Sequence, residues 1–162
     1  MCLTLLPFSE DDSVEIASWP RDTNELKTWA GADAVFPLKL EQFRIWHDDP
    51  ETHTFIGRHK GQLVAYGELW IDESEQEIEL ARIIVHPASR NKGIGQMFVT
   101  ALVAQSETFG LVDRFLRVLP ENTIAIRCYQ KSGFKVLPAD VQKTFNQRQP
   151  VEYVWMKYQS IS

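Results

Sequence analysis

Apolar and polar positions change their pattern twice along the chain. Short apolar clusters between polar runs fill the first 50 residues and predict one strand followed by three short helices. The middle contains two strand-like runs separated by His59-Lys60-Gly61, which predicts a hairpin. From Gly93 the helical period returns, because Ile94, Met97, Phe98, Ala101 and Leu102 are spaced for one face of an amphipathic helix. The expected strands are residues 2–8, 52–57, 62–71, 77–86, 114–118, 134–136 and 151–158, and the expected helices are 13–19, 24–30, 37–46, 93–108 and 123–131.

The stretch from Glu77 to Phe134 alternates between strands and helices, and this order favours α/β packing. The antiparallel hairpin before it makes the expected sheet mixed. The last two strands are expected to be joined by a polar loop. The chain has no internal repeat, low-complexity tract or Gly/Ser linker, so a single domain over residues 1–162 is expected.

Composition narrows the classes of function. The chain has 162 residues, 24% of them charged, and a net charge of -5, which is unfavourable for binding a phosphate backbone and argues against a nucleic-acid partner. No apolar run approaches the ~20 residues that cross a bilayer, and the N-terminus lacks the features of a signal peptide. We therefore expect a cytoplasmic protein without a membrane partner. Cys2, Cys128 and the four histidines show no metal-ligand spacing, so no metal is expected.

A glycine-containing turn lies between a predicted strand and the amphipathic helix. Gly93 and Gly95 allow the backbone to approach a ligand closely, and the free N–H groups of a first helical turn attract anions. Arg90 and Lys92 add positive charge. The spacing does not match a P-loop, and Phe98 stands where a dinucleotide fingerprint needs its third glycine. The turn therefore predicts a phosphate site of another kind.

Two segments resemble the signature of the GNAT acetyltransferase superfamily. Residues 84–95 contain its Arg/Gln-x-x-Gly-x-Gly/Ala element as Arg90-Asn91-Lys92-Gly93-Ile94-Gly95, and residues 122–134 resemble Asn-x-x-Ala-x-x-x-Tyr-x-x-x-Gly-Phe. The resemblance covers residues 77–134. It implies a GNAT-like fold, with a central twisted mixed sheet of about six or seven strands and helices on both faces. It also implies acetyl-CoA as co-substrate and an amine as acceptor.

The resemblance assigns cofactor contacts to both segments. The end of the predicted strand 77–86 would pair its backbone with the extended pantetheine arm, and amides from Asn91 to Gln96 would hold the pyrophosphate. The implied cofactor-binding residues are Ile83, Ile84, Val85, Arg90, Asn91, Lys92, Gly93, Ile94, Gly95, Gln96, Asn122 and Tyr129.

Two of these residues have alternative interpretations. Asn122, Ala125, Ile126 and Tyr129 share one helical face, and the resemblance points the Tyr129 hydroxyl at the cofactor sulfur as general acid. Tyr129 could instead be a core aromatic. Asn122 could be a helix N-cap, a cofactor contact or both.

Glu79 is the expected general base, because some family members use a glutamate at the matching position, usually through water. It lies six residues before Val85, so the alternation of a regular strand puts both on one face. Six residues of straight strand span about 20 Å, so a bulge or a chain of waters is part of this expectation. Glu77 is the nearest competitor. The acidic hairpin 72–79 could also be simply solvated, with no enzymatic base needed.

Other reactive side chains are not expected to take part. His86 lies on the opposite strand face from Val85 and is interpreted as structural. Cys128 has no activating neighbour, so direct transfer in a ternary complex is the simpler mechanism. The tryptophans Trp19, Trp29, Trp46 and Trp70 favour core packing over an aromatic acceptor wall.

The leading hypothesis is an N-acetyltransferase that acts on a primary amine of a small molecule or peptide. Acetylation of a protein lysine or N-terminus is an alternative, and a non-catalytic acyl-CoA-binding sensor is a second. Monomer and homodimer both stay open.

Overall fold

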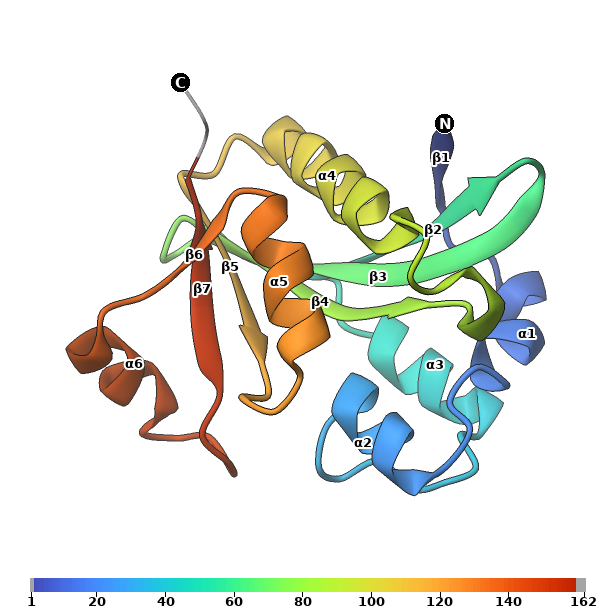
Figure 1. Cartoon of the computed structure of the whole chain (residues 1–162), viewed down its shortest axis with the longest axis horizontal. Helices are drawn as coiled ribbons and strands as arrows, with labels where there is room; N and C mark the ends of the chain where they lie inside the picture. The colour runs from blue at the N-terminus through green and yellow to red at the C-terminus, as the bar shows by residue number, and fades with distance from the viewer. Residues whose placement is uncertain (1, 160–162) are drawn as a thin grey trace.

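The computed structural model describes residues 2–159, in which a seven-stranded mixed sheet carries helices on both faces (Figure 1). The strands are β1 Leu3–Pro7, β2 Thr52–His59, β3 Gln62–Asp72, β4 Glu77–Val85, β5 Asp113–Val118, β6 Phe134–Val136 and β7 Val154–Tyr158. Their order is β1-β2-β3-β4-β5-β7-β6, in which β4 and β5 are parallel and all other neighbours antiparallel. This arrangement confirms the predicted fold class.

The helices divide into two layers. They are α1 Ser13–Ala17, α2 Thr23–Ala30, α3 Leu40–His47, α4 Ile94–Ser106, α5 Thr123–Lys131 and α6 Ala139–Asn146, with 3-10 turns η1 Glu10–Asp12, η2 Pro87–Ser89 and η3 Glu107–Phe109. Helices α4 and α5 pack on one face, where Phe98 and Leu102 of α4 join the larger apolar core. Helices α1, α2 and α3 cover the other face around a second core that contains Trp19, Trp29 and Trp46. The expectation that the tryptophans are core residues is confirmed for these three, whereas Trp70 is half-buried and belongs to neither core.

The hairpin between β2 and β3 follows from its turn residues. Lys60 and Gly61 both have positive φ, 52° and 77°, which is the backbone that a tight two-residue hairpin turn requires. His59 pairs with Gln62 across this turn, so the predicted hairpin is confirmed.

A bulge interrupts β4 and changes which residues share a face. Tyr66 of β3 pairs with Ile84, but Glu68 pairs with Ala81, so β4 carries one extra residue between these pairs. Ile83 and Val85 therefore contact the α4-side core, whereas Glu79 pairs directly with Trp70 on the opposite face. The prediction that Glu79 and Val85 share a face was wrong because the bulge reverses the alternation. The predicted bulge itself is confirmed.

The largest differences from the sequence prediction lie in three segments. The expected loop between the last strands contains α6, which Phe145 holds to the sheet by packing 5.5 Å from Phe115 and 5.1 Å from Trp155. Helix α3 begins at Leu40 rather than at Pro37, and β7 begins at residue 154 rather than 151. In the part of the chain that the structure describes, no helix is both long and apolar enough to span a bilayer.

Candidate active site

The turn between β4 and α4 presents a row of free backbone donors. Asn91 and Gly93 both adopt left-handed backbone, with φ of 61° and 81°, and α4 begins at the next residue. Within residues 2–159, no acceptor is present for the backbone N–H groups of residues 91–96. The first amide of this segment to find a partner is Met97, which donates to the Gly93 carbonyl at 3.2 Å. Free N–H groups at the start of a helix are the features that the predicted anion site requires.

The Arg90 side chain connects this turn to β4 and α2. Its Nε donates to the Val85 carbonyl oxygen at 3.1 Å, and its Nη1 donates to Glu25 of α2 at 3.0 Å. The guanidinium is therefore engaged by β4 and α2, and Lys92 is the exposed basic side chain of the turn. The sequence prediction that Arg90 simply adds charge to the turn missed this bracing role.

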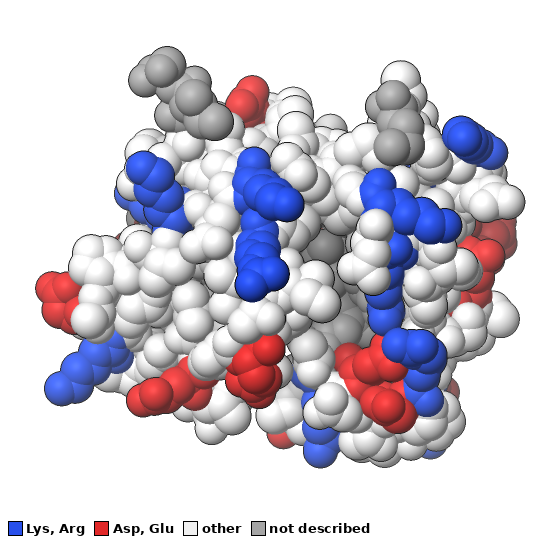
Figure 2. Space-filling view, viewed as in Figure 1, with Lys and Arg blue, Asp and Glu red and all other residues white. Residues whose placement is uncertain are grey.

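Three predicted elements meet at Gly95. A Cβ at this position would lie 3.4 Å from Cys128 Sγ of α5 and 3.7 Å from Val85 Cγ2 of β4. Gln96 also donates to the Lys131 carbonyl oxygen of α5, at 3.5 Å. The end of β4, the start of α4 and the inner face of α5 are thus in contact. Figure 2 shows a hollow on this side of the molecule, with basic side chains over α5 and over the turn before α4.

The end of β4 offers an open edge beside this meeting point. β4 pairs with β5 only from Glu77 to Glu79. Ile83, Ile84 and Val85 have no β5 partner among the described residues. The two parallel strands therefore separate and leave the β5-facing backbone edge of these residues without a strand partner.

Asn122 and Tyr129 both belong to α5: Asn122 is its N-cap, and Tyr129 lies in its last turn. The Asn122 side chain accepts a hydrogen bond from the Ala125 amide at 3.3 Å, so its N-cap role is confirmed. Tyr129 is half-buried, with its ring 6.3 Å from that of Phe134. Its hydroxyl makes no hydrogen bond to another described residue. Burial raises the pKa of Tyr129, so the phenol keeps its proton at neutral pH and can act as a proton donor.

Cys128 and His86 show no sign of activation. Burial raises the pKa of the Cys128 thiol, which disfavours the nucleophilic thiolate. His86 Nδ1 accepts a hydrogen bond from the Ala88 amide at 3.0 Å, and its ring packs 5.4 Å from that of Trp19. Both residues fit the structural interpretation.

Glu79 lies on the sheet face opposite α4. Its two carboxylate oxygens accept hydrogen bonds from Nε and Nη2 of Arg117, at 2.7 and 2.9 Å. Burial raises the pKa of Glu79, and the Arg117 guanidinium opposes that shift in part. The competitor Glu77 lies further from the bulge, at the start of β4, where burial and then the nearby Asp72 raise its pKa.

Sequence reasoning missed a buried polar cluster beside Glu79. The Glu68 side chain has no exposed surface and accepts hydrogen bonds from Tyr66, from Trp70 Nε1 at 2.8 Å and from Arg82 Nη1 at 2.7 Å. The available signal was one charged residue within each of two apolar runs, Glu68 within residues 63–71 and Arg82 within residues 80–85, since long charged side chains are rarely buried without a partner. Arg117 lies in the same way between two apolar residues of β5.

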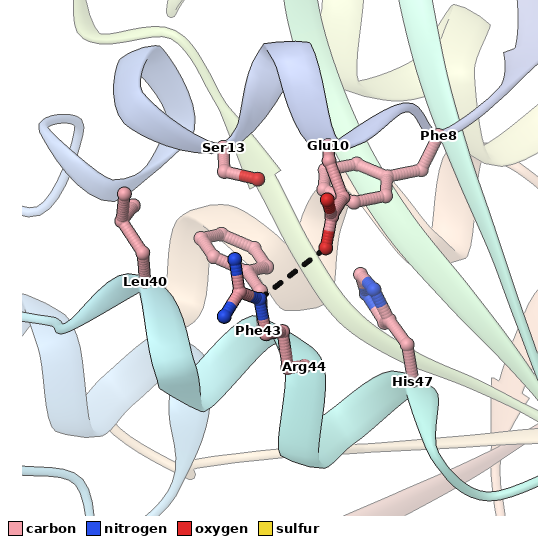
Figure 3. A pocket seen from close by; sticks show the side chains of 7 residues that line it. All are labelled: Phe8, Glu10, Ser13, Leu40, Phe43, Arg44 and His47. Atoms are coloured by element: carbon pink, nitrogen blue, oxygen red, sulfur yellow. Dashed lines mark hydrogen bonds and ion pairs between the residues drawn. The ribbon is translucent and has the colours of Figure 1, made fainter.

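A separate small cavity lies between α3 and the N-terminal segment (Figure 3). It is lined by Phe8, Glu10, Ser13, Leu40, Phe43, Arg44 and His47. Arg44 and Glu10 close one side with a 3.4 Å ion pair. A wider groove of about 630 Å³ runs from η1 and the β2–β3 hairpin to the turn between β4 and α4, where it reaches Ser89 and Lys92. The first cavity contains none of the predicted site residues, and the groove contains only Lys92.

Comparison with known proteins finds a family match that includes β4, α4 and α5. Residues 15–134 match the sequence model of the acetyltransferase (GNAT) family. Over 99 residues the chain is 27% identical to an uncharacterized N-acetyltransferase of Mycobacterium tuberculosis, and the match covers 61% of this chain and 63% of that relative. A UPF0039 protein of Schizosaccharomyces pombe is 32% identical over 84 residues, which cover 51% of this chain and 54% of the relative. The chain thus spans less than two thirds of the length of these curated relatives.

Solved structures share the fold over nearly the whole chain. An aminoglycoside acetyltransferase, AAC(6')-Ib, in complex with paromomycin and acetyl-CoA superposes with a TM-score of 0.78 at 21% identity, covering 98% of this chain and 94% of that one. A spermidine N-acetyltransferase from Vibrio cholerae, in complex with CoA and spermine, superposes with a TM-score of 0.71 at 23% identity, covering 84% and 82%. At these identities the likeness shows the fold.

Proposed function

Because the chain belongs to the GNAT family of acetyltransferases, we propose that it transfers an acetyl group from acetyl-CoA to a primary amine of a small molecule or peptide. The observation that carries this proposal is the meeting of β4, α4 and α5 at Gly95. At this point an open strand edge, a row of free amides and a tyrosine hydroxyl lie on neighbouring elements. The acceptors of the structural neighbours, an aminoglycoside and a polyamine, are also amines.

The donor side of the site fits acetyl-CoA. The amides of residues 91–96 would hold the pyrophosphate, since within the described residues they have no other acceptor. The backbone edge of Ile83, Ile84 and Val85 that has no β5 partner would pair with the pantetheine arm. When bound, acetyl-CoA supplies the acyl group and a thiolate leaving group.

Proton transfers are assigned to two side chains. Tyr129 would give its hydroxyl proton to the departing sulfur, because a buried phenol remains protonated at neutral pH. Glu79 would take the proton that the amine loses, through water. It lies on the sheet face opposite α4, so the amine would approach from the side of α2 and α3. Direct transfer needs no enzyme nucleophile, which agrees with the raised pKa of Cys128.

A paired assay tests the function. Thermal unfolding with and without acetyl-CoA measures binding, and a ligand that binds only the folded state stabilises it by about 2.7 kcal/mol at a hundredfold excess over Kd. Thiol release from acetyl-CoA across amino acids, peptides, polyamines and aminoglycosides then measures transfer. We expect both signals. Stabilisation without thiol release from any amine would favour an acyl-CoA sensor, and no thermal response to millimolar acetyl-CoA would contradict the whole assignment.

Glu79→Gln tests the proposed base. We expect turnover to fall by about 10²-fold, the lower end of what a general base contributes, because part of the amine is already deprotonated in solution. Since burial raises the pKa of Glu79, the wild-type rate should decline with falling pH at a higher pH than an ordinary glutamate would cause. That acid limb should weaken or move in the variant.

Glu77→Gln is the matched control and should leave the rate and the limb unchanged. Measuring the pH profile with two amines of different pKa separates the alternatives, because an enzyme limb stays in place while a substrate limb follows the amine. If Glu79→Gln keeps both the rate and the limb, the amine binds already deprotonated and Glu79 is not the base.

A further inference from the structure

Two arginines and three tryptophans form an alternating stack across the sheet face opposite α4. Arg82 Cζ lies 4.2 Å from the ring centre of Trp46 in α3 and 4.9 Å from that of Trp70 in β3. Arg117 Cζ lies 5.5 Å from the same Trp70 ring and 4.8 Å from that of Trp155 in β7. We call these five residues the arginine–tryptophan stack. Each guanidinium over an aromatic face is held by a cation–π attraction.

The stack lies where β4 and β5 separate. The last pair between these strands is Glu79 with Phe115, and the two arginines follow three residues later on β4 and two residues later on β5. Under the proposed function, the same opening receives the acyl end of acetyl-CoA. An amine that approaches from the face opposite α4 therefore meets the stack.

The carboxylates that pair with the arginines lie deeper than the arginines themselves. The Glu68 side chain is fully buried, whereas that of Arg82 is 19% exposed. For the second pair, the side chain of Glu79 is 17% exposed and that of Arg117 24%. At the first pair, the Arg82 guanidinium is therefore the group that a ligand can reach, and the balancing carboxylate of Glu68 lies behind it.

Arg82 differs from Arg117 in its unused donors. Arg117 donates through Nε and Nη2 to Glu79 and through Nη1 to Gln149. Arg82 donates through Nη1 to Glu68, but its Nη2 has no acceptor within residues 2–159, and its Nε is buried without a partner. Since Nε is inaccessible, Nη2 is the group that can still bind a ligand.

The backbone at Arg82 is held in an unfavourable conformation. Its φ of 47° lies in the left-handed region, which is unfavourable for a residue other than glycine. Trp29 of α2 donates from Nε1 to the Arg82 carbonyl oxygen at 2.7 Å, and the Glu68 pair holds the side chain. Strain of this kind, held by tertiary contacts, is characteristic of functional positions.

We propose that Arg82 Nη2 binds a carboxylate or carbonyl oxygen that the acceptor carries next to its amine. The acceptor class is then an amino acid or a peptide N-terminus rather than a polyamine. A guanidinium favours such oxygens through charge-assisted hydrogen bonds. This inference rests on the proposed function.

Calorimetry on the protein saturated with CoA tests the inference without requiring turnover. The ligands are L-phenylalanine, L-phenylalaninamide and phenethylamine, which share a ring and a primary amine and differ in the neighbouring oxygen. We expect both oxygen-bearing ligands to bind the wild type more tightly than phenethylamine. In Arg82→Lys, which keeps the charge opposite Glu68, this preference should shrink by about tenfold, as expected for a lost charge-assisted hydrogen bond. The amines differ in pKa, but the comparison between enzyme forms cancels that difference.

Arg44→Lys is the matched control, because it makes the same change in an exposed ion pair outside the stack. It should keep the preference. If Arg82→Lys fails to fold, the double variant Arg82→Met with Glu68→Gln removes both charges and should lose the preference as well. Wild-type protein that binds phenethylamine or spermidine at least as tightly as L-phenylalanine overturns the inference, as does an unchanged preference in Arg82→Lys. Absence of thiol release with an intact preference would contradict the transfer activity and leave the oxygen contact standing.

Discussion

Tyr129→Phe is expected to lower turnover by about 10²- to 10⁴-fold, with little change in the affinity for acetyl-CoA. The substitution removes only the hydroxyl and keeps the ring that packs near Phe134. A group that protonates the leaving thiolate acts mainly in the transition state, so its loss should lower kcat and kcat/KM together. Because burial raises the pKa of this phenol, the wild-type hydroxyl should remain a proton donor across the physiological range. Steady-state thiol release gives the rates, and thermal shift with acetyl-CoA gives the binding.

Tyr158→Phe is the control for this experiment. Tyr158 packs against the same Phe134 ring, at 5.5 Å, but belongs to β7 rather than to the proposed site. It should keep wild-type turnover. A Tyr129→Phe enzyme that folds, binds acetyl-CoA and turns over at the wild-type rate would assign Tyr129 to packing alone.

Gly93→Asp should abolish stabilisation by acetyl-CoA. A Cβ at Gly93 would have no protein atom within 4 Å, and Gly93 is the N-cap of α4, so the new carboxylate would stand next to the free amides of the first helical turn. Negative charge there competes for the N–H groups and repels pyrophosphate. The loss of the full shift, about 2.7 kcal/mol at a hundredfold ligand excess, should appear in a thermal titration.

Two controls separate charge from backbone strain. Gly93→Asn has nearly the same shape without the charge and tolerates left-handed backbone, so it should retain part of the shift. Gly110→Asp places aspartate at another left-handed glycine, with φ of 68° and open space around it, just after η3. It should respond to acetyl-CoA like the wild type. Equal loss in Gly93→Asn and Gly93→Asp would show that strain, and not charge at a pyrophosphate site, explains the effect.

Arg82 and Arg117 differ in their free donors, and this difference bears on the class of acceptor that the proposed enzyme would bind. A screen guided by the structural neighbours alone would begin with aminoglycosides and polyamines. The unused donor of Arg82 instead directs attention to amines with a neighbouring oxygen. Both groups of ligands belong in the same panel, because their relative rates distinguish the two acceptor classes directly.

Local physical rules explain why much of this protein is readable from its sequence. The turn before α4 follows from glycines that permit left-handed backbone and from the helical period after it. The bounds of α5 and β6 match the prediction. An N-cap asparagine marks the start of α5, and a glycine with φ of 102° separates its end from β6. Both cofactor segments are continuous stretches of chain, so their chemistry was visible before the fold was known.

Contacts between segments that are distant in the chain could not be predicted from the sequence pattern. Regular alternation put Glu79 on the face of Val85, but the bulge in β4 reversed it, and pairing with β3 fixes that bulge. The pair of Glu68 and Arg82 is separated by 14 residues, and that of Glu79 and Arg117 by 38. Helix α6 lies in a segment that was expected to be a polar loop, and Phe145 packs it against Trp155. The sequence by itself determined the fold class and the segments of the proposed donor side, because those depend on local backbone preferences. Only the three-dimensional packing of distant residues brought together the side chains of the proposed acceptor side.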